Sequence, residues 1–449
     1  MRPSLALIIA TVLATTGCAS LRDTITLPRT ISPSSATVPL PPSFIQTKGL
    51  SQANLTDDAV LNSLLGLVDN SPDMAIATGR LAEANARLEA ARAGLLPSIS
   101  GTASISGIGA KDVTGASSGV LGSSLLVPLD LFGANRGRVG ATRARAEEAA
   151  YNKDRTLAVT GATLSQLYVA LRTAQAQIVV TQSNQASASD SLSLAITRQR
   201  AGLETGLAVA QATSNRDAIG ARLPGFQQAE IAARLGIEAL LGKLPDALSA
   251  QVNPVRPIPR FDLSRVNLPP DQWITTRADL VAAQRRLQVA GLEARAAQRD
   301  RYPNLSLTAL VNQTSASRGP TGLAGSVSAN LLATLFDFGR LDALARAAGA
   351  VAQTEAALYR QRVVNALADV ETQASRVDRG NAAIAANAAN IASAQDQARL
   401  ARVRYTSGLS GFLDVLTAER AVYEAQSAGV AAIGETALGE VALNLALGF

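Results

Sequence analysis

The 449-residue chain contains no histidine and a single cysteine, Cys18. It therefore offers no imidazole base, no thiol nucleophile beyond this residue and no His/Cys metal site. It also lacks a glycine-rich phosphate-binding loop between a strand and a helix. Catalysis by carboxylates alone is the one kind of enzyme chemistry that the composition does not exclude. We expect no catalytic residue, no metal site, no cofactor and no enzyme activity.

Aromatic residues are scarce, at 3% of the chain, although hydrophobic residues make up 47%. This composition, rich in alanine and small polar residues, favours closely packed helices over one large globular core. The formal net charge is +6, and basic residues such as Arg136, Arg138, Arg143 and Arg145 are spread along expected helices. Because no aromatic stacking platform accompanies them, solvated helix faces are favoured and no nucleic-acid partner is expected.

Long hydrophobic runs are missing after the first residues of the chain. Arg2 and the apolar run 5–14 are followed by Cys18, and the run is too short to span a bilayer. This pattern predicts a signal peptide over 1–17. An unpaired thiol in an exported chain is explained by lipidation of Cys18, the alternative being a secreted protein with an idle thiol. Prolines then favour an extended tether over 18–50.

The rest of the chain is a duplicated unit with a spacing of 206 residues. Four landmarks repeat at this spacing: Asp73 and Asp279, Pro97 and Pro303, Phe132-Gly133 and Phe338-Gly339, and Gly202 and Gly408. Unrelated residue types in one register indicate a true repeat. We place the first repeat at 51–242 and the second at 271–449, with a proline-rich surface linker over 243–270 around the waist of the helical body.

Each repeat contains one predicted β-hairpin, over 97–130 and 303–336. A proline ends the helical pattern, and residues 98–107 then alternate Ser or Thr with Ile, Gly or Ala. The second repeat alternates in the same way from Asn304. The Gly/Ser/Thr-rich segments inside the two hairpins, 108–118 and 314–322, are expected to be loops.

The hairpins allow two interpretations. Soluble hairpins packed on helices are one, since single strands carry a weak signal. A face of Ser, Thr and Asn, together with strands of about ten residues, favours strands that cross a membrane around a water-filled lumen. Four strands cannot close a barrel and open edges are not tolerated in lipid, so this second interpretation requires oligomers, and three copies would give twelve strands.

Two segments without proline, 135–200 and 340–406, are predicted to be single helices of 66 and 67 residues. At 1.5 Å per residue each is roughly 100 Å long, which is deeper than an ordinary globular domain. A glycine-containing turn follows each long helix. We expect four shorter helices, over 51–94, 207–242, 271–301 and 412–447.

Three kinds of short motif accompany this organisation. The first kind stands at the start of each predicted hairpin: Leu96-Pro97-Ser98 and Tyr302-Pro303-Asn304. The second kind stands at the end of each hairpin: Asp130-Leu131-Phe132-Gly133 and Phe336-Asp337-Phe338-Gly339. The third spans the second helical turn, from Arg404-Tyr405 through Leu413-Asp414-Val415-Leu416. With these motifs the chain resembles TolC-type outer-membrane efflux proteins of the lipoprotein branch, the NodT-like outer-membrane factors of tripartite efflux pumps. The resemblance covers nearly everything after Cys18.

The resemblance implies an α+β membrane protein, in which the duplicated unit gives a trimeric twelve-stranded β-barrel continued by a long α-helical barrel. It implies a location in the bacterial outer membrane, with a lipid anchor at Cys18 and the helical part in the periplasm. The implied partners are two further copies of the chain, a periplasmic membrane-fusion (adaptor) protein, an inner-membrane pump of the RND type and outer-membrane lipid.

The resemblance also implies a docking surface at the two helical turns. In the family, a Val-Gly-Leu-Ser/Thr motif at each turn meets the adaptor; here the matching segments are 201–204 and 407–410, and Glu204 departs from the motif. The implied docking residues are Gly202, Leu203, Gly408, Leu409 and Ser410. The glycines are needed for the turns in either case.

A periplasmic gate is implied next to the second turn. The family pattern Leu-Asp-Val-Leu-Asp-Ala faces the constriction, and the segment here is Leu413-Asp414-Val415-Leu416-Thr417-Ala418, with Thr417 in place of the second acid. The implied gate residues are Leu413, Asp414, Thr417, Arg420 and Tyr405. The alternative role for Asp414 is to charge the first turn of its helix, where a carboxylate is favoured.

The function implied is the exit duct of a tripartite efflux system, conducting drugs or other small organic compounds. Type I protein secretion and metal efflux stay open as functions of the same channel, although Met74 is the one methionine after the signal and soft metals favour sulfur and imidazole ligands. A structural trimeric coiled-coil surface lipoprotein is the rival from another class; it should show sustained heptads and no hairpins.

Overall fold

The computed structural model describes residues 56–110, 113–263, 274–275, 277–316 and 321–448. The predicted signal peptide, Cys18, the tether and the end of the linker lie outside these residues. Within the described part of the chain, no helix combines the length and the hydropathy that crossing a membrane requires. The chain divides into two compact units, which are described one at a time.

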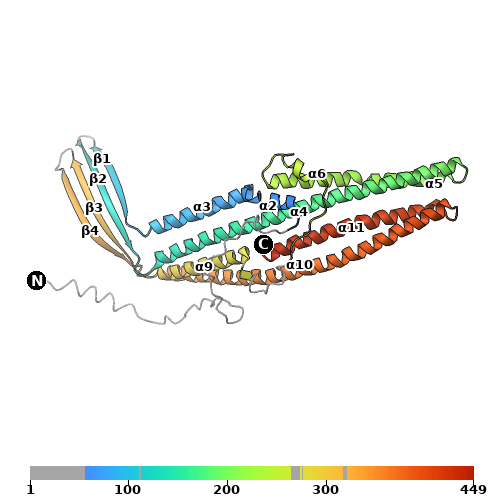
Figure 1. Ribbon diagram of the computed structural model, residues 1–449. Coiled ribbons are helices and arrows are strands. Elements are labelled where there is room, and N and C mark those ends of the chain that lie inside the picture. The colour runs from blue at the N-terminus through green and yellow to red at the C-terminus, as the bar shows by residue number, and fades with distance from the viewer. Residues whose placement is uncertain (1–55, 111–112, 264–273, 276, 317–320, 449) are drawn as a thin grey trace. The chain divides into compact units, whose positions relative to one another are not determined.

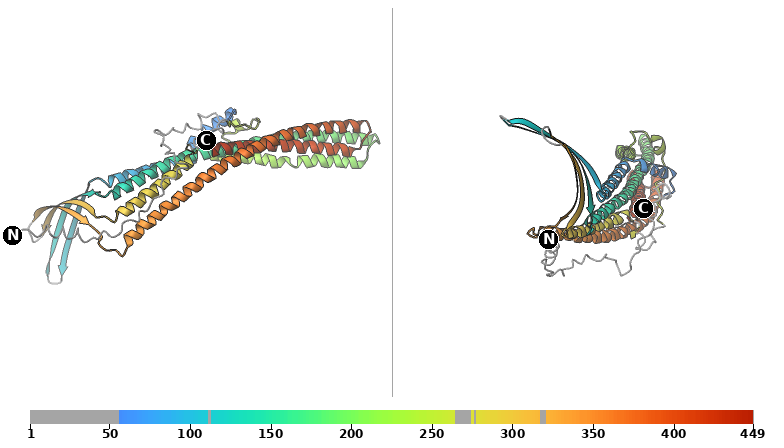
Figure 2. Two further views of the ribbon diagram at one scale, coloured as in Figure 1. Left: turned by 90° about the horizontal axis from the view of Figure 1, so that it is seen from below. Right: turned by 90° about the vertical axis from the view of Figure 1, so that its left-hand side faces the viewer.

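The first unit contains Arg92–Ala141 and Leu287–Leu358 and is built on a four-stranded sheet (Figure 1). Its strands are β1 (Ser98–Ala110), β2 (Val113–Leu129), β3 (Asn304–Ala316) and β4 (Gly322–Leu332). They pair antiparallel in the order β1-β2-β3-β4. The sheet is therefore an open meander with β1 and β4 at its edges, and it is visibly curved (Figure 2, right).

The two hairpins of this sheet have the same register. Ser98 of β1 lies opposite Leu126 of β2, and Asn304 of β3 lies opposite Leu332 of β4, so both members of the pair move by 206 residues. The duplication seen in the sequence thus extends to individual pairs across the strands. The contact between β2 and β3 joins one repeat to the other.

Each face of the sheet has its own chemistry. On one face the hydroxyls of Ser100 and Ser124 are 2.6 Å apart and those of Ser106 and Ser118 are 2.9 Å apart. The other face carries exposed apolar side chains: Ile99, Ile105, Leu121, Val327 and Leu331. The alternation in the sequence therefore produces a hydroxyl-rich face and an apolar face, and both are exposed in the single chain.

The strands differ from expectation at their outer ends. β1 continues to Ala110, β2 already begins at Val113, and β3 continues to Ala316, whereas loops were expected over 108–118 and 314–322. Glycine and serine have low strand propensity, but pairing with the neighbouring strand overrides that local preference. The loop prediction was therefore wrong for most of these residues.

The second unit contains Ser43–Ala91, Thr142–Arg286 and Tyr359–Phe449, and it is helical (Figure 1). Two helices of 67 residues, α4 (Ala134–Arg200) and α10 (Arg340–Thr406), begin in the first unit and continue into the second. The return helices are α5 (Gly206–Gly220), α6 (Leu223–Leu240) and α11 (Phe412–Ala446). The α4–α5 and α10–α11 turns lie at the same end of this unit (Figures 1 and 2).

Two expected helices are broken where the sequence has proline. The helix expected over 207–242 is divided into α5 and α6, and Pro224 lies in the first turn of α6. The helix expected over 51–94 is divided into α2 (Ala59–Leu65), the short η2 (Val68–Asn70) and α3 (Pro72–Ala93). Proline lacks an N–H and suits a first turn, which explains both breaks. The helix before the second hairpin is α9 (Ala278–Arg299).

The core of the second unit also contains part of the linker. Leu248, Val252 of α7 (Ser249–Val252) and Phe261 are buried against residues of α2, α4, α6 and α11. Arg172 of α4 is fully buried and donates to the carbonyl oxygens of Val252 at 3.0 Å and Pro254 at 2.7 Å. Most of the other described residues of this stretch are exposed, so it lies at the surface and is anchored to the helical core by these few side chains.

Candidate docking tips and channel gate

Both helical turns end in the same backbone motif. The N–H of Leu203 donates to Arg198 O at 2.9 Å, and the N–H of Leu409 donates to Arg404 O at 2.8 Å. Gly202 and Gly408 have φ values of +71° and +73°, the left-handed conformation that this cap requires. The repeated motif gives the two turns the same local geometry.

Each turn presents leucine side chains to solvent. Leu203 is 66% exposed and Leu409 is 71% exposed. Leu207 and Leu413, four residues further along each return helix, are also exposed. Leu207 was not predicted as a site residue. Its spacing of 206 residues from Leu413, a predicted gate residue, marks it as the equivalent position in the first repeat. The hydroxyl oxygen of the predicted tip residue Ser410 is buried and has no hydrogen-bond partner within the described residues.

The first turns of α11 have a buried side and an exposed side, and three of the predicted gate residues lie on the exposed side. Phe412, Val415 and Leu416 are buried, whereas Leu413, Asp414 and Thr417 are exposed on the other side of the helix. The Thr417 hydroxyl donates to Leu413 O at 2.8 Å. Gly411 is the N-cap residue, so the capping position is not occupied by Asp414, which lies in the first turn. The structure thus brings Leu413, Asp414 and Thr417 together on one exposed face.

Tyr405 lies on the other side of the turn, in the core of the tip. Its ring is almost fully buried, packs edge-on against Phe412 at 5.5 Å and lies 4.6 Å from the guanidinium carbon of Arg198. Its hydroxyl is 3.2 Å from the carboxylate of Glu204. Burial, then the charge of Glu204, raises the pKa of Tyr405, so the hydroxyl keeps its proton and donates it to Glu204. This contact joins α10 to the α4–α5 turn.

Arg420 makes a second link between the two repeats. Its Nε donates to Asn215 Oδ1 of α5 at 3.1 Å. These two predicted gate residues therefore have different partners: Tyr405 contacts the first turn, and Arg420 contacts α5. Within the described residues, neither is recorded in contact with Asp414.

A third link contains a buried acid that was not predicted. Glu419 of α11 accepts a hydrogen bond from Ser191 of α4, and it lies 3.4 Å from the guanidinium of Arg402 on α10. Its side chain is 12% exposed. Burial raises the pKa of Glu419, against the lowering effects of Ser191 and Arg402. Sequence alone gave no signal for this contact, because its members are up to 228 residues apart.

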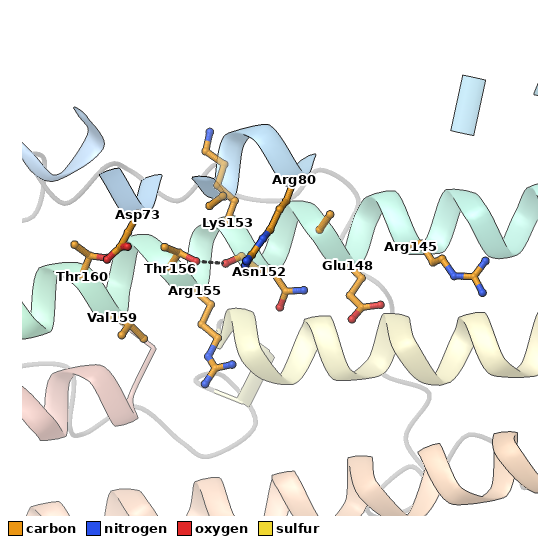
Figure 3. Close-up of a pocket in the computed structure, with 12 residues that line it drawn as sticks. Asp73, Arg80, Arg145, Glu148, Asn152, Lys153, Arg155, Thr156, Val159 and Thr160 are labelled. Carbon is orange, nitrogen blue, oxygen red and sulfur yellow. Dashed lines mark hydrogen bonds between the residues drawn. The ribbon is translucent and has the colours of Figure 1, made fainter. Parts of the chain in front are cut away.

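A groove of about 600 Å³ lies between α3 and α4, away from the tips (Figure 3). Four basic residues and two acidic residues line it: Arg80, Arg145, Lys153, Arg155, Asp73 and Glu148. The carboxylate of Glu148 is paired with Arg286 of α9 at 2.6 Å. None of the predicted docking or gate residues line this groove. The candidate site is therefore kept at the two helical turns and the first turns of α11.

The chain is similar in sequence to known proteins over most of its length. The profile of the family described as outer membrane efflux protein matches residues 66–243 and 270–449. The pyoverdine export outer membrane protein OpmQ of Pseudomonas aeruginosa is 27% identical over 379 residues, covering 80% of this chain and 79% of OpmQ. The cation efflux system protein CusC of Escherichia coli strain K12 is 26% identical over 407 residues, covering 87% of each chain.

The fold also matches a solved structure. The outer-membrane channel OprN is similar with a TM-score of 0.82 at 27% identity, covering 87% of this chain and 90% of that one. The family profile spans both repeats. The chain belongs to the outer membrane efflux protein family.

Proposed function

We propose that three copies of this chain form a twelve-stranded β-barrel in the bacterial outer membrane, continued by an α-helical barrel in the periplasm. In this assembly the protein is the passive exit duct of a tripartite efflux system. The observation that carries the proposal is the open four-stranded sheet, with its two unpaired edges and its two exposed faces of opposite chemistry.

The sheet supports a barrel for two physical reasons. The row of unpaired backbone groups along β1 and β4 is not tolerated in lipid, and pairing with other copies removes it. The apolar face suits contact with lipid, and the hydroxyl face suits a water-filled lumen. A soluble hairpin pair would need a cover for the apolar face.

The tips supply the contact with the rest of the pump. The exposed Leu203 and Leu409, held by identical caps, form an apolar docking surface for a periplasmic membrane-fusion (adaptor) protein. Gly202, Gly408 and Ser410 shape the same turns. The adaptor connects the duct to an inner-membrane pump of the RND type.

The gate lies on the exposed face of α11. Three-fold symmetry brings three copies of Asp414 around the axis as a cation-attracting ring, with Leu413 as an apolar plug and Thr417 one turn away. Tyr405 and Arg420 hold the helices of one chain together through Glu204 and Asn215. The closed state is the one in which these links are made.

Drugs or other small organic compounds are the proposed substrates. Met74, the sole methionine after the predicted signal peptide, is buried in the core and cannot line a route for soft metal ions. CusC is named a cation efflux protein, so metal efflux stays the alternative substrate class, along with type I protein secretion. Lipidation of Cys18 adds an anchor in outer-membrane lipid.

The proposal is tested with the full chain in two assays. Trimers purified from outer membranes should conduct ions in planar bilayers. Expressed with a periplasmic adaptor protein and an inner-membrane pump of the RND type, the chain should restore drug resistance to a strain that lacks its own outer-membrane channels. A purified chain that stays monomeric and leaves bilayers unconducting would refute the duct.

A further inference from the structure

The groove between α3 and α4, the α3–α4 groove, contains two basic side chains without a partner in the described part of the chain. Arg80 extends from α3 toward α4, and Lys153 extends from α4 toward α3 (Figure 3). Neither side chain makes a hydrogen bond or an ion pair with another described residue. Two like charges in one groove repel each other, and an anion bound between them removes that repulsion.

The two acidic residues of the groove do not cancel this charge. Glu148 is already paired with Arg286 of α9 at 2.6 Å. Asp73 lies in the first turn of α3, where the positive end of the helix dipole favours a carboxylate. With four basic residues against these two acids, the groove keeps an excess of positive charge.

The second repeat shows that this excess is not a general feature of the duplicated fold. The residues 206 positions beyond Arg80 and Lys153 are Arg286 and Tyr359. Arg286 has the acidic partner that Arg80 lacks, and tyrosine is uncharged at neutral pH. The other differences replace Arg145 by Val351 and Arg155 by Gln361, and add one charge of each sign, Arg362 and Glu355. The excess of positive charge therefore belongs to the first repeat alone.

The lining of the groove combines this charge with apolar surface. Ala77, Ala149 and Val159 contribute methyl groups, and the alkyl stems of arginine and lysine are apolar as well. Asn152 and Thr156 add an amide and a hydroxyl group. A volume of about 600 Å³ lies in the range of sites for small organic molecules and is far larger than an inorganic ion needs.

We propose that the α3–α4 groove binds an amphipathic organic anion, with a carboxylate, sulfonate or phosphate group on an apolar body. The anionic group lies between Arg80 and Lys153, and the body lies against the apolar lining. This site is separate from the tips and the gate, and binding to it does not depend on the proposed duct. Two sources can supply such an anion: a compound that the duct conducts, or an anion of the cell envelope that stays bound.

Amine-reactive footprinting tests the site directly, because Lys153 and Lys243 are the only lysines among the described residues. The purified full chain, in a neutral detergent, is acetylated with and without 5-carboxyfluorescein, and each lysine is quantified by mass spectrometry. The dye should slow acetylation of Lys153 severalfold and leave the exposed Lys243 unchanged. Equal concentrations of inorganic phosphate, or of rhodamine 6G, a cationic dye with the same ring system, should protect neither lysine.

Variants show whether the charges carry the binding. Arg80→Glu should weaken binding of 5-carboxyfluorescein about tenfold, measured by fluorescence anisotropy, because attraction becomes repulsion. Lys153→Gln should weaken it as well, and Lys153→Arg should retain it. Arg360→Glu is the matched control, since Arg360 is an exposed arginine of α10 outside the groove. Equal protection of Lys153 by both dyes, or unchanged affinity in Arg80→Glu, would overturn the site.

Resistance measurements identify the source of the anion. If conducted compounds bind in the groove, Arg80→Glu combined with Lys153→Gln lowers resistance to anionic drugs and leaves resistance to cationic drugs unchanged. If neither resistance changes although the footprint is lost, the ligand is an anion that is not transported. Both results leave the duct intact, because failure of the duct would remove resistance from the unaltered chain.

Discussion

Tyr405 lies at the point where the α10–α11 turn is tied to the α4–α5 turn. Its buried ring is held by Arg198 and Phe412, and its hydroxyl contacts Glu204. Glu204 departs from the family motif in the sequence, and the structure gives this departure a partner. Residues 201 positions apart meet here, so local sequence patterns could not have predicted the pair.

Asp414 is the residue on which the proposed gate depends. In planar bilayers, Asp414→Ala should lower the cation-over-anion permeability ratio by roughly twofold to tenfold, because a ring of three carboxylates concentrates cations. Block by multivalent cations should weaken as well. Thr417→Ala is the matched control on the same exposed face, and it should leave both properties unchanged. If only Thr417→Ala alters these two properties, Asp414 does not form the ring, and its role is limited to charging the first turn of its helix.

Glu419 should make the tip sensitive to pH. Burial raises its pKa above the ordinary 4.5, so the folded chain binds this proton more tightly than the unfolded chain. The stabilisation is complete below pH 4.5 and is lost as pH rises through the raised value. Arg402 on α10, with Ser191 and Asp190 on α4, faces the carboxyl group.

Hydrogen exchange measures this dependence. After correction for intrinsic rates, the first turns of α11 should exchange more slowly at pH 5 than at pH 7, and Glu419→Gln should remove the difference. An equal pH dependence in Glu419→Gln would assign it to other groups.

Some helix and strand boundaries are determined by nearby residues in the sequence, and others by pairing with distant strands. The long helices could be predicted within one residue of their observed starts because no proline interrupts them. The outer ends of β1 and β2 could not, since glycine and serine become strand only through cross-strand pairing. The breaks at Pro72 and Pro224 are local in origin too, because each proline marks the start of a helix.

The caps at the two turns depend on glycine for backbone conformation alone. No atom lies within 4 Å of a Cβ built on Gly408, yet its φ is +73°. Gly408→Ala should therefore destabilise the turn by about 1–2 kcal/mol. Gly79, in the middle of α3, has equally open surroundings and helical φ, and Gly79→Ala should stabilise its helix by roughly 1 kcal/mol. Hydrogen exchange of the turn and of α3 measures the two changes in local stability. If both substitutions stabilised, or both destabilised, the explanation by backbone conformation would be contradicted.

At the scale of the whole molecule, the compact units do not follow the repeats. Each unit takes segments from both repeats, because α4 and α10 each contribute to both units. The duplication was readable from the sequence through its spacing. The division into units was not, because it depends on contacts between the repeats.

The proposed docking surface includes a turn from each repeat, so its test changes both turns. Leu203→Asp combined with Leu409→Asp should abolish efflux, measured as drug resistance, while trimers still form, because charge replaces the apolar contact with the adaptor. Leu244→Asp is the control, since Leu244 is equally exposed but belongs to the linker. Undiminished resistance in the double variant would place the docking surface elsewhere.

In the proposed trimer, the equal registers of the two hairpins make three copies of the chain equivalent to six copies of one half. If the halves were separate polypeptides, the ring would form in proportion to the sixth power of their concentration. With the halves joined, three of the six joints are intramolecular, and assembly depends on the third power. The fusion therefore favours complete rings at the low concentrations at which an exported protein reaches its membrane, and it leaves the β2–β3 contact free to change in sequence independently of the contacts between copies.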